Sequence, residues 1–309
     1  MAVTQPAADA RPDPAARVDD GGPRFRVADY AVILKPRVMS LVVFTAAVGM
    51  ALAPGSIAPA AALVAITCIA AGAGASGAIN MWYDQDIDRA MRRTMNRPIP
   101  AGRMRPAVAL VIGTALGLAA VAVMAWTINP LAAGLLALTI LYYVFIYTVW
   151  LKRRTPQNIV IGGVSGALPP MIGWAAVNGE MGPGALLLFA VIFLWTPPHS
   201  WALALFRNAD YVAANVPMMP VVAGEKNTKR LIGVYTALLL PVTLLAPAVG
   251  LAGWPYEIAA ALLGIGFAAH VIRLVRAPDV GPARPLFLYS ILDLFLIFVA
   301  LLADRALPR

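Results

Sequence analysis

The sequence predicts an all-α protein that crosses a membrane nine times, and three observations support this fold class. Hydrophobic residues make up 61% of the 309 residues, charged residues only 13%, and the mean hydropathy is +0.77. A soluble core of this length cannot bury so much apolar surface. The apolar residues form uncharged runs, each long enough to cross about 30 Å of hydrocarbon as a helix. Basic residues gather in alternate connections between these runs.

Nine runs have the required length, and they lack the short alternating pattern of membrane barrel strands. In chain order they cover residues 38–54, 57–79, 107–127, 130–151, 157–177, 183–206, 231–250, 256–272 and 286–303. The only acidic, basic or histidine side chains within them are His199, Glu257, His270 and Asp293.

The distribution of Lys and Arg predicts the orientation. Of the 24 basic residues, 22 precede the first run or lie in the connections after runs two, four, six and eight. Basic connections face the cytoplasm, so we expect a cytoplasmic amino terminus, an external carboxyl terminus and an odd number of spans. Because topology accounts for the net charge of +9, nucleic-acid binding is not expected.

The amino-terminal segment and the single cysteine indicate the domain organisation and exclude some kinds of site. Residues 1–28 are rich in Ala, Pro, Asp and Arg and lack the apolar segment and cleavage site of a signal peptide, so we expect a disordered cytoplasmic tail. Residues 29–309 then form one domain. The lone Cys68 excludes a disulfide framework and multi-cysteine metal motifs.

The first long cytoplasmic connection, about residues 80–106, carries a regular set of oxygen ligands. Asn80, Asp84 and Asp88 are spaced i, i+4 and i+8, so on a helix continuing from the second run they share one face. Asp86 falls roughly opposite. Hard oxygen ligands of this kind suit Mg²⁺ shared with a substrate phosphate, and the arginines that follow can donate to phosphate oxygens.

A second long connection, residues 207–230, places Asp210 just beyond the cytoplasmic end of another apolar run. Long ordered loops are usually functional. Two acidic segments on one membrane face could hold a single diphosphate through bridging metal ions. Basic residues near Asp210 could neutralise the remaining charge; they are Arg207, Lys226, Lys229 and Arg230.

A metal-binding mouth that opens onto an apolar bundle fits a substrate with a diphosphate head and a hydrocarbon tail. Metal and arginine would neutralise the leaving diphosphate, so that the allylic C–O bond ionises. Aromatic rings in the bundle could stabilise the carbocation, although for any single ring a packing role is favoured. These aromatics are Trp82, Tyr83, Tyr142, Tyr143, Tyr147, Trp174, Trp195 and Trp201.

Several motifs together resemble the UbiA-type intramembrane prenyltransferases over about residues 30–300. The first is Asn80-x₃-Asp84-x₃-Asp88, followed by Arg93-Thr94 and Asn96-Arg97-Pro98. The others narrow the resemblance to the members that prenylate heme. They are Lys35-Pro36-Arg37, Leu151 to Asn158, Pro169 to Trp174, Trp195-Thr196-Pro197-Pro198-His199, Asp210-Tyr211 and Pro217 to Pro220.

This resemblance implies a nine-helix UbiA-type bundle in the inner membrane of a bacterial cell, with its site toward the cytoplasm. It implies Mg²⁺-dependent transfer of the farnesyl group of farnesyl diphosphate to a vinyl group of heme b, with water addition, giving heme O and diphosphate. The implied metal and catalytic residues are Asn80, Asp84, Asp88 and Asp210. The implied diphosphate contacts are Arg37, Arg93, Arg97, Lys152 and Lys226.

Two histidines and one acid lie within apolar runs. His199 lies about 12 Å inside the cytoplasmic end of its run. Its imidazole could ligate heme iron, or it could hydrogen-bond within the bundle, for example to a carbonyl freed by Pro197 or Pro198. For His270 a packing role is favoured. An intramembrane carboxyl such as Asp293 is usually paired or functional.

Two other functions remain open. A membrane transporter is consistent with nine spans and with His199 and Asp293 at depth, but transport sites usually lie near the midplane, whereas most charges here lie at one face. The second is a UbiA-type prenyltransferase with another acceptor. Only the motifs that narrow the resemblance to heme prenylation argue against it. The sequence does not decide whether the chain forms homo-oligomers.

Overall fold

The computed structural model describes residues 26–307, apart from the side chains of residues 37 and 38, and every regular element in this part is a helix. In chain order the elements are α1 (Val27–Ile33), α2 (Pro36–Leu52), α3 (Pro59–Tyr83), α4 (Gln85–Ala90), α5 (Pro106–Thr127), α6 (Pro130–Leu141), the π-helix η1 (Tyr142–Leu151), α7 (Asn158–Ala167), α8 (Pro169–Asn178), α9 (Pro183–Phe206), α10 (Asn208–Ala213), α11 (Met219–Thr243), the 3₁₀-helix η2 (Pro247–Val249), α12 (Trp254–Arg276) and α13 (Ala283–Ala306). The all-α prediction is confirmed. Of the predicted tail, residues 1–25 lie outside the described part.

Each predicted run coincides with one helix or with two consecutive helices. Within the described residues, seven spans are long and apolar enough to cross a membrane; α6 with η1 forms one of them, and α7 with α8 another. The apolar part of α2, Met39–Leu52, is shorter, and the first half of α11 carries charged side chains. Large apolar side chains face outward on the long helices, for example Leu118 and Leu262 at 69% and 65% exposure. The chain is therefore a multi-pass membrane protein.

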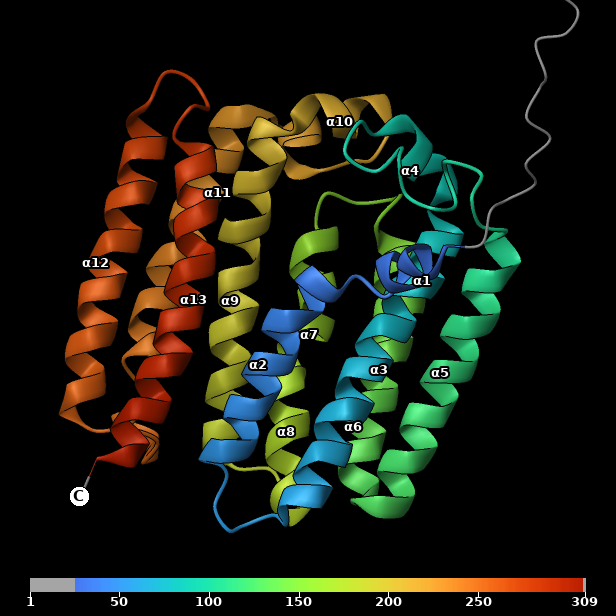
Figure 1. Ribbon diagram of the computed structural model, residues 1–309. Coiled ribbons are helices and arrows are strands. Elements are labelled where there is room, and N and C mark those ends of the chain that lie inside the picture. Colours follow the sequence, from blue (N-terminus) through green and yellow to red (C-terminus); the bar gives the residue numbers. More distant parts are fainter. Residues whose placement is uncertain (1–25, 308–309) are drawn as a thin grey trace, which may run out of the picture.

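The long helices lie side by side and place both long connections at the same end of the bundle. Figure 1 shows the short helices α4 and α10 close together at that end, while α13 ends at the opposite end. The expectation that the two acidic connections share one face is therefore confirmed.

Proline explains where many of these helices begin. Six of the α-helices have Pro as their first residue: α2, α3, α5, α6, α8 and α9. Proline fits there because its fixed φ suits the first turn and the missing N–H would have no helical partner. At α6 the Asn129 side chain also accepts a hydrogen bond from the Ala132 N–H, at 2.8 Å.

Small residues allow very close packing of α2 against α8. A Cβ placed on Gly49 would lie 2.1 Å from the Pro170 carbonyl oxygen, and one on Gly173 would lie 2.0 Å from that of Ala46. Larger residues would push the two backbones apart. Such close contact between small residues is a main source of helix association in membranes.

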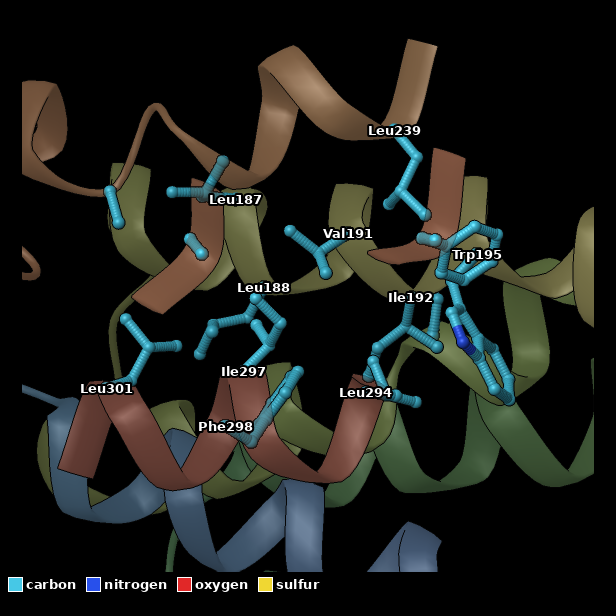
Figure 2. Packing of buried hydrophobic residues seen from close by; sticks show 14 of the residues in the cluster. Leu187, Leu188, Val191, Ile192, Trp195, Leu239, Leu294, Ile297, Phe298 and Leu301 are labelled. Atoms are coloured by element: carbon cyan, nitrogen blue, oxygen red, sulfur yellow. The ribbon is translucent and has the colours of Figure 1, made fainter. Parts of the chain in front are cut away.

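The largest buried cluster joins α9, α11, α12 and α13, together with buried residues of α2 and α8. Figure 2 shows its centre, where Leu188 and Ile192 of α9 face Leu294 and Phe298 of α13. A second cluster joins α3, α5, α6 and α8. The two packed groups leave the polar residues of α4, η1 and α10 together at one end.

Candidate active site

A cavity of about 160 Å³ lies where α2, α3, α4, η1 and α10 meet. Four basic side chains line it, together with one amide, one carboxylate and three phenols: Lys35, Arg93, Arg97, Lys152, Asn80, Asp88, Tyr143, Tyr147 and Tyr211. This excess of positive charge at the mouth of an apolar bundle suits a polyanionic head group on an apolar substrate.

The end of α3 positions the three predicted oxygen ligands. The helix does not run straight on, because Asp84 departs from helical geometry (φ −91°, ψ 19°) and separates α3 from α4. The i+4 hydrogen bonds nevertheless continue from Asp84 N to Asn80 O (2.9 Å) and from Asp88 N to Asp84 O (2.8 Å). All three side chains are buried, whereas the Asp86 side chain is 61% exposed, as its predicted opposite position requires.

Cations compensate both buried carboxylates of this segment. Lys152 forms an ion pair with Asp84, and Arg97 donates to both oxygens of Asp88 at 2.8 and 2.9 Å. The Asn80 amide joins the network, because its Nδ2 donates to Asp84 at 2.6 Å and its Oδ1 accepts from Lys35 at 2.7 Å. Arg97 and Lys152 were predicted from the resemblance as diphosphate contacts, and both line the cavity.

Lys35 is a cavity residue that the sequence reasoning did not select. Its backbone is left-handed (φ 52°, ψ 51°) although it is not a glycine, and it lies directly before α2. Residues held in this way cluster at functional sites. Burial and the nearby Arg97 and Lys152 lower the pKa of Lys35 to about 7. Its place in the Lys35-Pro36-Arg37 motif was the available signal, but the prediction selected Arg37.

Arg153, also not selected, connects two acids outside the cavity. It donates to both oxygens of Asp86 at 2.6 and 2.7 Å and approaches Asp84 at 3.5 Å. The hydrogen bonds from Arg153 lower the pKa of Asp86 to about 2, and the same contact raises the pKa of Arg153.

The π-helix η1 brings Tyr143, Tyr147 and Lys152 to one wall of the cavity. Tyr143 and Lys152 are nine residues apart, which in an α-helix of 3.6 residues per turn places them on opposite faces. A π-helix takes more residues per turn because its hydrogen bonds span five residues, as between Lys152 N and Tyr147 O at 2.9 Å. The wider turn lets all three side chains line the cavity. The hydropathy pattern gives no sign of this local change.

The second acidic segment reaches the cavity through Tyr211. The Tyr211 hydroxyl accepts a hydrogen bond from Arg93 at 2.9 Å, and the guanidinium lies 5.1 Å from the ring centroid. Asp210 is buried but does not line the cavity, and its Oδ2 has no hydrogen-bond partner within the described residues. The structure thus brings the two acidic segments together through Arg93 and Tyr211, whereas Asp210 itself does not line the cavity.

The remaining predicted contacts lie elsewhere. Lys226 is exposed on α11 and does not line the cavity, and the side chain of Arg37 lies outside the described part. Lys229 points away and donates to the carbonyl oxygens of Ala277 and Asp279. Among the described residues, no group of three or more His, Cys, Asp or Glu side chains is assembled as a metal site. The metal ligands therefore remain a prediction.

His199 lies in α9, away from the cavity, and hydrogen-bonds within the bundle. Its Nδ1 is 2.8 Å from the hydroxyl oxygen of Ser290 on α13. The imidazole is stacked between Trp195 and Phe287, with ring centroids at 4.2 and 4.7 Å. Its partner is Ser290, so the expected bond to a carbonyl freed by Pro197 or Pro198 is absent among the described residues.

Comparison with known proteins identifies the family. The UbiA prenyltransferase family model matches residues 42–298, most of the chain, so the chain belongs to that family. A protein of Parvibaculum lavamentivorans named protoheme IX farnesyltransferase is 56% identical over 283 residues, covering 90% of this chain and 89% of that protein.

Solved structures share the fold at low sequence identity. A structure described as a digeranylgeranylglyceryl phosphate synthase in membranes is 17% identical with a TM-score of 0.75, over 90% of this chain and 97% of the other. A UbiA homolog from Archaeoglobus fulgidus bound to DMAPP and Mg²⁺ is 15% identical with a TM-score of 0.62, over 88% and 99%.

Proposed function

We propose that the protein transfers the farnesyl group of farnesyl diphosphate to a vinyl group of heme b, with addition of water, giving heme O and diphosphate. The observation that carries the proposal is the cavity lined by four basic side chains, two of which pair with Asp84 and Asp88, in a chain 56% identical to a protein named protoheme IX farnesyltransferase. The heme acceptor and the C15 donor are taken from that relative.

The cavity cations are proposed to bind the diphosphate by exchanging partners. Lys152 and Arg97 compensate carboxylates in the free protein, and an entering diphosphate offers them more acceptor oxygens. Lys35 and Arg93 line the same space and add charge-assisted donors. The diphosphate contacts of Arg37 and Lys226 are expectations from the resemblance alone and are not part of this cavity set.

Mg²⁺ is proposed to bind with the diphosphate at Asn80, Asp84, Asp88 and Asp210. The donors are all oxygens of amide or carboxylate groups, which suits a hard cation. The buried Asp210 Oδ2, which has no hydrogen-bond partner within the described residues, supports this fit. Bound Mg²⁺ stabilises the negative charge of the leaving diphosphate.

The chemistry proceeds by loss of diphosphate from C1 of the farnesyl chain, with the electron pair of the C1–O bond. Tyr143 and Tyr147, whose rings lie 5.3 Å apart beside Lys152, present aromatic faces and phenol oxygens to the developing cation. The terminal vinyl carbon of heme b attacks C1. Water then adds to the vinyl carbon next to the porphyrin and loses a proton, which yields the hydroxyethylfarnesyl group.

The proposed topology has nine spans in a bacterial inner membrane, with the cavity toward the cytoplasm and α13 ending outside. Seven of these spans are the long apolar ones described above, and the other two are α2 and the apolar second half of α11. The basic residues of the connections support the orientation.

The direct test is to incubate purified protein with heme b, farnesyl diphosphate and Mg²⁺ and to analyse the hemes by mass spectrometry. The proposal requires a heavier, more apolar heme and an equal amount of diphosphate. Diphosphate release without a new heme would indicate another acceptor, and unchanged substrates would contradict prenyl transfer.

A further inference from the structure

We infer that Ser290 is a positioning residue that fixes the tautomer of His199, so that Nε2 can coordinate the iron of the heme acceptor; this rests on the proposed function. The imidazole and the hydroxyl lie on different helices, α9 and α13, and neither side chain lines the cavity described above. The directions of two hydrogen bonds at the Ser290 hydroxyl support this role.

The first bond assigns the serine proton. The Ser290 hydroxyl oxygen lies 2.7 Å from the carbonyl oxygen of Phe287. Two oxygens approach this closely only with a proton between them, and the carbonyl has none to give. Ser290 therefore donates to Phe287 and has only lone pairs left for other neighbours.

The second bond then assigns the imidazole proton. His199 Nδ1 lies 2.8 Å from the same hydroxyl oxygen, which can now only accept, so Nδ1 carries the hydrogen. A neutral imidazole protonated at Nδ1 has its lone pair on Nε2. Among the described residues no group hydrogen-bonds Nε2, and the side chain is only half-buried. Metal-binding histidines typically donate their second ring nitrogen in this way.

The surrounding rings hold the imidazole plane. Trp195 and Phe287 stack on its two faces, with interplanar angles of 17° and 27°. Trp195 is itself fixed, since its indole N–H donates to the Ser290 carbonyl oxygen at 2.8 Å. A ligand can therefore approach only at the ring edge that carries Nε2. One α13 residue orients both the imidazole and the indole that covers it.

The experiment measures heme b binding by the purified protein through the absorption and resonance Raman spectra, without farnesyl diphosphate. We expect an imidazole-ligated spectrum that His199→Ala removes. Ser290→Ala should shift the spectrum and weaken heme binding about tenfold, as for other partners of metal ligands. Ser290→Thr keeps the hydroxyl and should restore both properties.

Ser165→Ala is the matched control. Ser165 is buried in α7 and, like Ser290, donates to the carbonyl three residues before it, that of Gly162, at 2.8 Å. It should bind heme as the wild type does. Equal spectra and affinities for Ser290→Ala and Ser165→Ala would overturn the positioning role. If Ser290→Ala does not fold, His199→Ala with added imidazole becomes the measurement: recovery of the ligated spectrum supports the coordination, and a wild-type spectrum without imidazole overturns it.

The two proposals can fail separately. A wild-type protein that prenylates heme but shows no imidazole ligation overturns the coordination and leaves the function. One that ligates heme through His199 but forms no prenylated heme overturns the function and leaves the coordination. A wild-type protein that binds no heme overturns both.

Discussion

The two acidic segments at the cavity end differ in how their carboxylates are balanced. In the first, Asp84 and Asp88 each have a cationic partner, Lys152 and Arg97 respectively. In the second, Asp210 is also buried, but its Oδ2 has no hydrogen-bond partner within the described residues.

This difference assigns different tasks to the two segments. A buried carboxylate without a partner is costly, whereas a paired one is tolerated. In the proposed function, the first segment would exchange its cations with an arriving diphosphate. The Oδ2 of Asp210 in the second segment would accept a cation that enters with the substrate.

The largest expected effect belongs to the first segment. Asp84→Ala should lower diphosphate release by about 1000-fold, since it removes a proposed metal ligand at the centre of the hydrogen-bond network. Asp84→Asn keeps the shape and should be nearly as inactive. Membrane insertion and the thermal unfolding of both variants serve as controls. Normal turnover by a well-folded Asp84→Asn protein would rule out the metal assignment.

The variants Asp88→Asn and Asp210→Asn test whether the carboxylates of the two segments are balanced differently. Both should lose about 100-fold in activity, by loss of a charge that holds the metal. Only Asp88→Asn should also lower the unfolding temperature, because it leaves Arg97 without its partner. Asp210→Asn removes no ion pair or hydrogen bond of Oδ2 and neutralises a buried carboxylate, so it should not lower the unfolding temperature. Equal unfolding temperatures of the two variants would contradict this difference between the carboxylates of Asp88 and Asp210.

Lys152→Gln and Lys226→Gln test which basic residues bind the diphosphate. Loss of the cavity residue Lys152 should raise the KM for farnesyl diphosphate by about 10- to 100-fold, the range for a charge-assisted hydrogen bond. Lys226 is exposed and away from the cavity, so its substitution should change KM by less than about twofold. Equal increases in KM would support the contact that the family resemblance implies at Lys226.

The sequence predicted the helices well because apolar length and proline positions determine them almost locally. It also placed Asn80, Asp84 and Asp88 together, since an i+4 spacing survives even the break at Asp84. What it could not predict depends on geometry beyond that local pattern. The π-helix changes which face Lys152 occupies, and the left-handed backbone of Lys35 directs its side chain to Asn80.

Hydrogen-bond partners that are distant in the sequence could likewise not be predicted. His199 and Ser290 are 91 residues apart, and no spacing rule joins them. Charge patterns identify which side chains need partners, but tertiary packing selects among the candidates. This explains why Lys229, near Asp210 in sequence, is bound instead to carbonyls beyond α12.

The smallest effect is expected at Asp86, which lies two residues from both Asp84 and Asp88. Its side chain is 61% exposed and pairs with Arg153 outside the cavity, and an exposed pair contributes about 1 kcal/mol at most. Its pKa is lowered to about 2, so its contribution is complete above the unfolded pKa, near 4, and is lost only as the pH falls toward 2. Asp86→Asn should therefore keep near-normal activity with an unchanged pH profile between pH 5 and 8. A loss comparable to that of Asp84→Asn would mean that Arg153, rather than the cavity cations, controls the first segment.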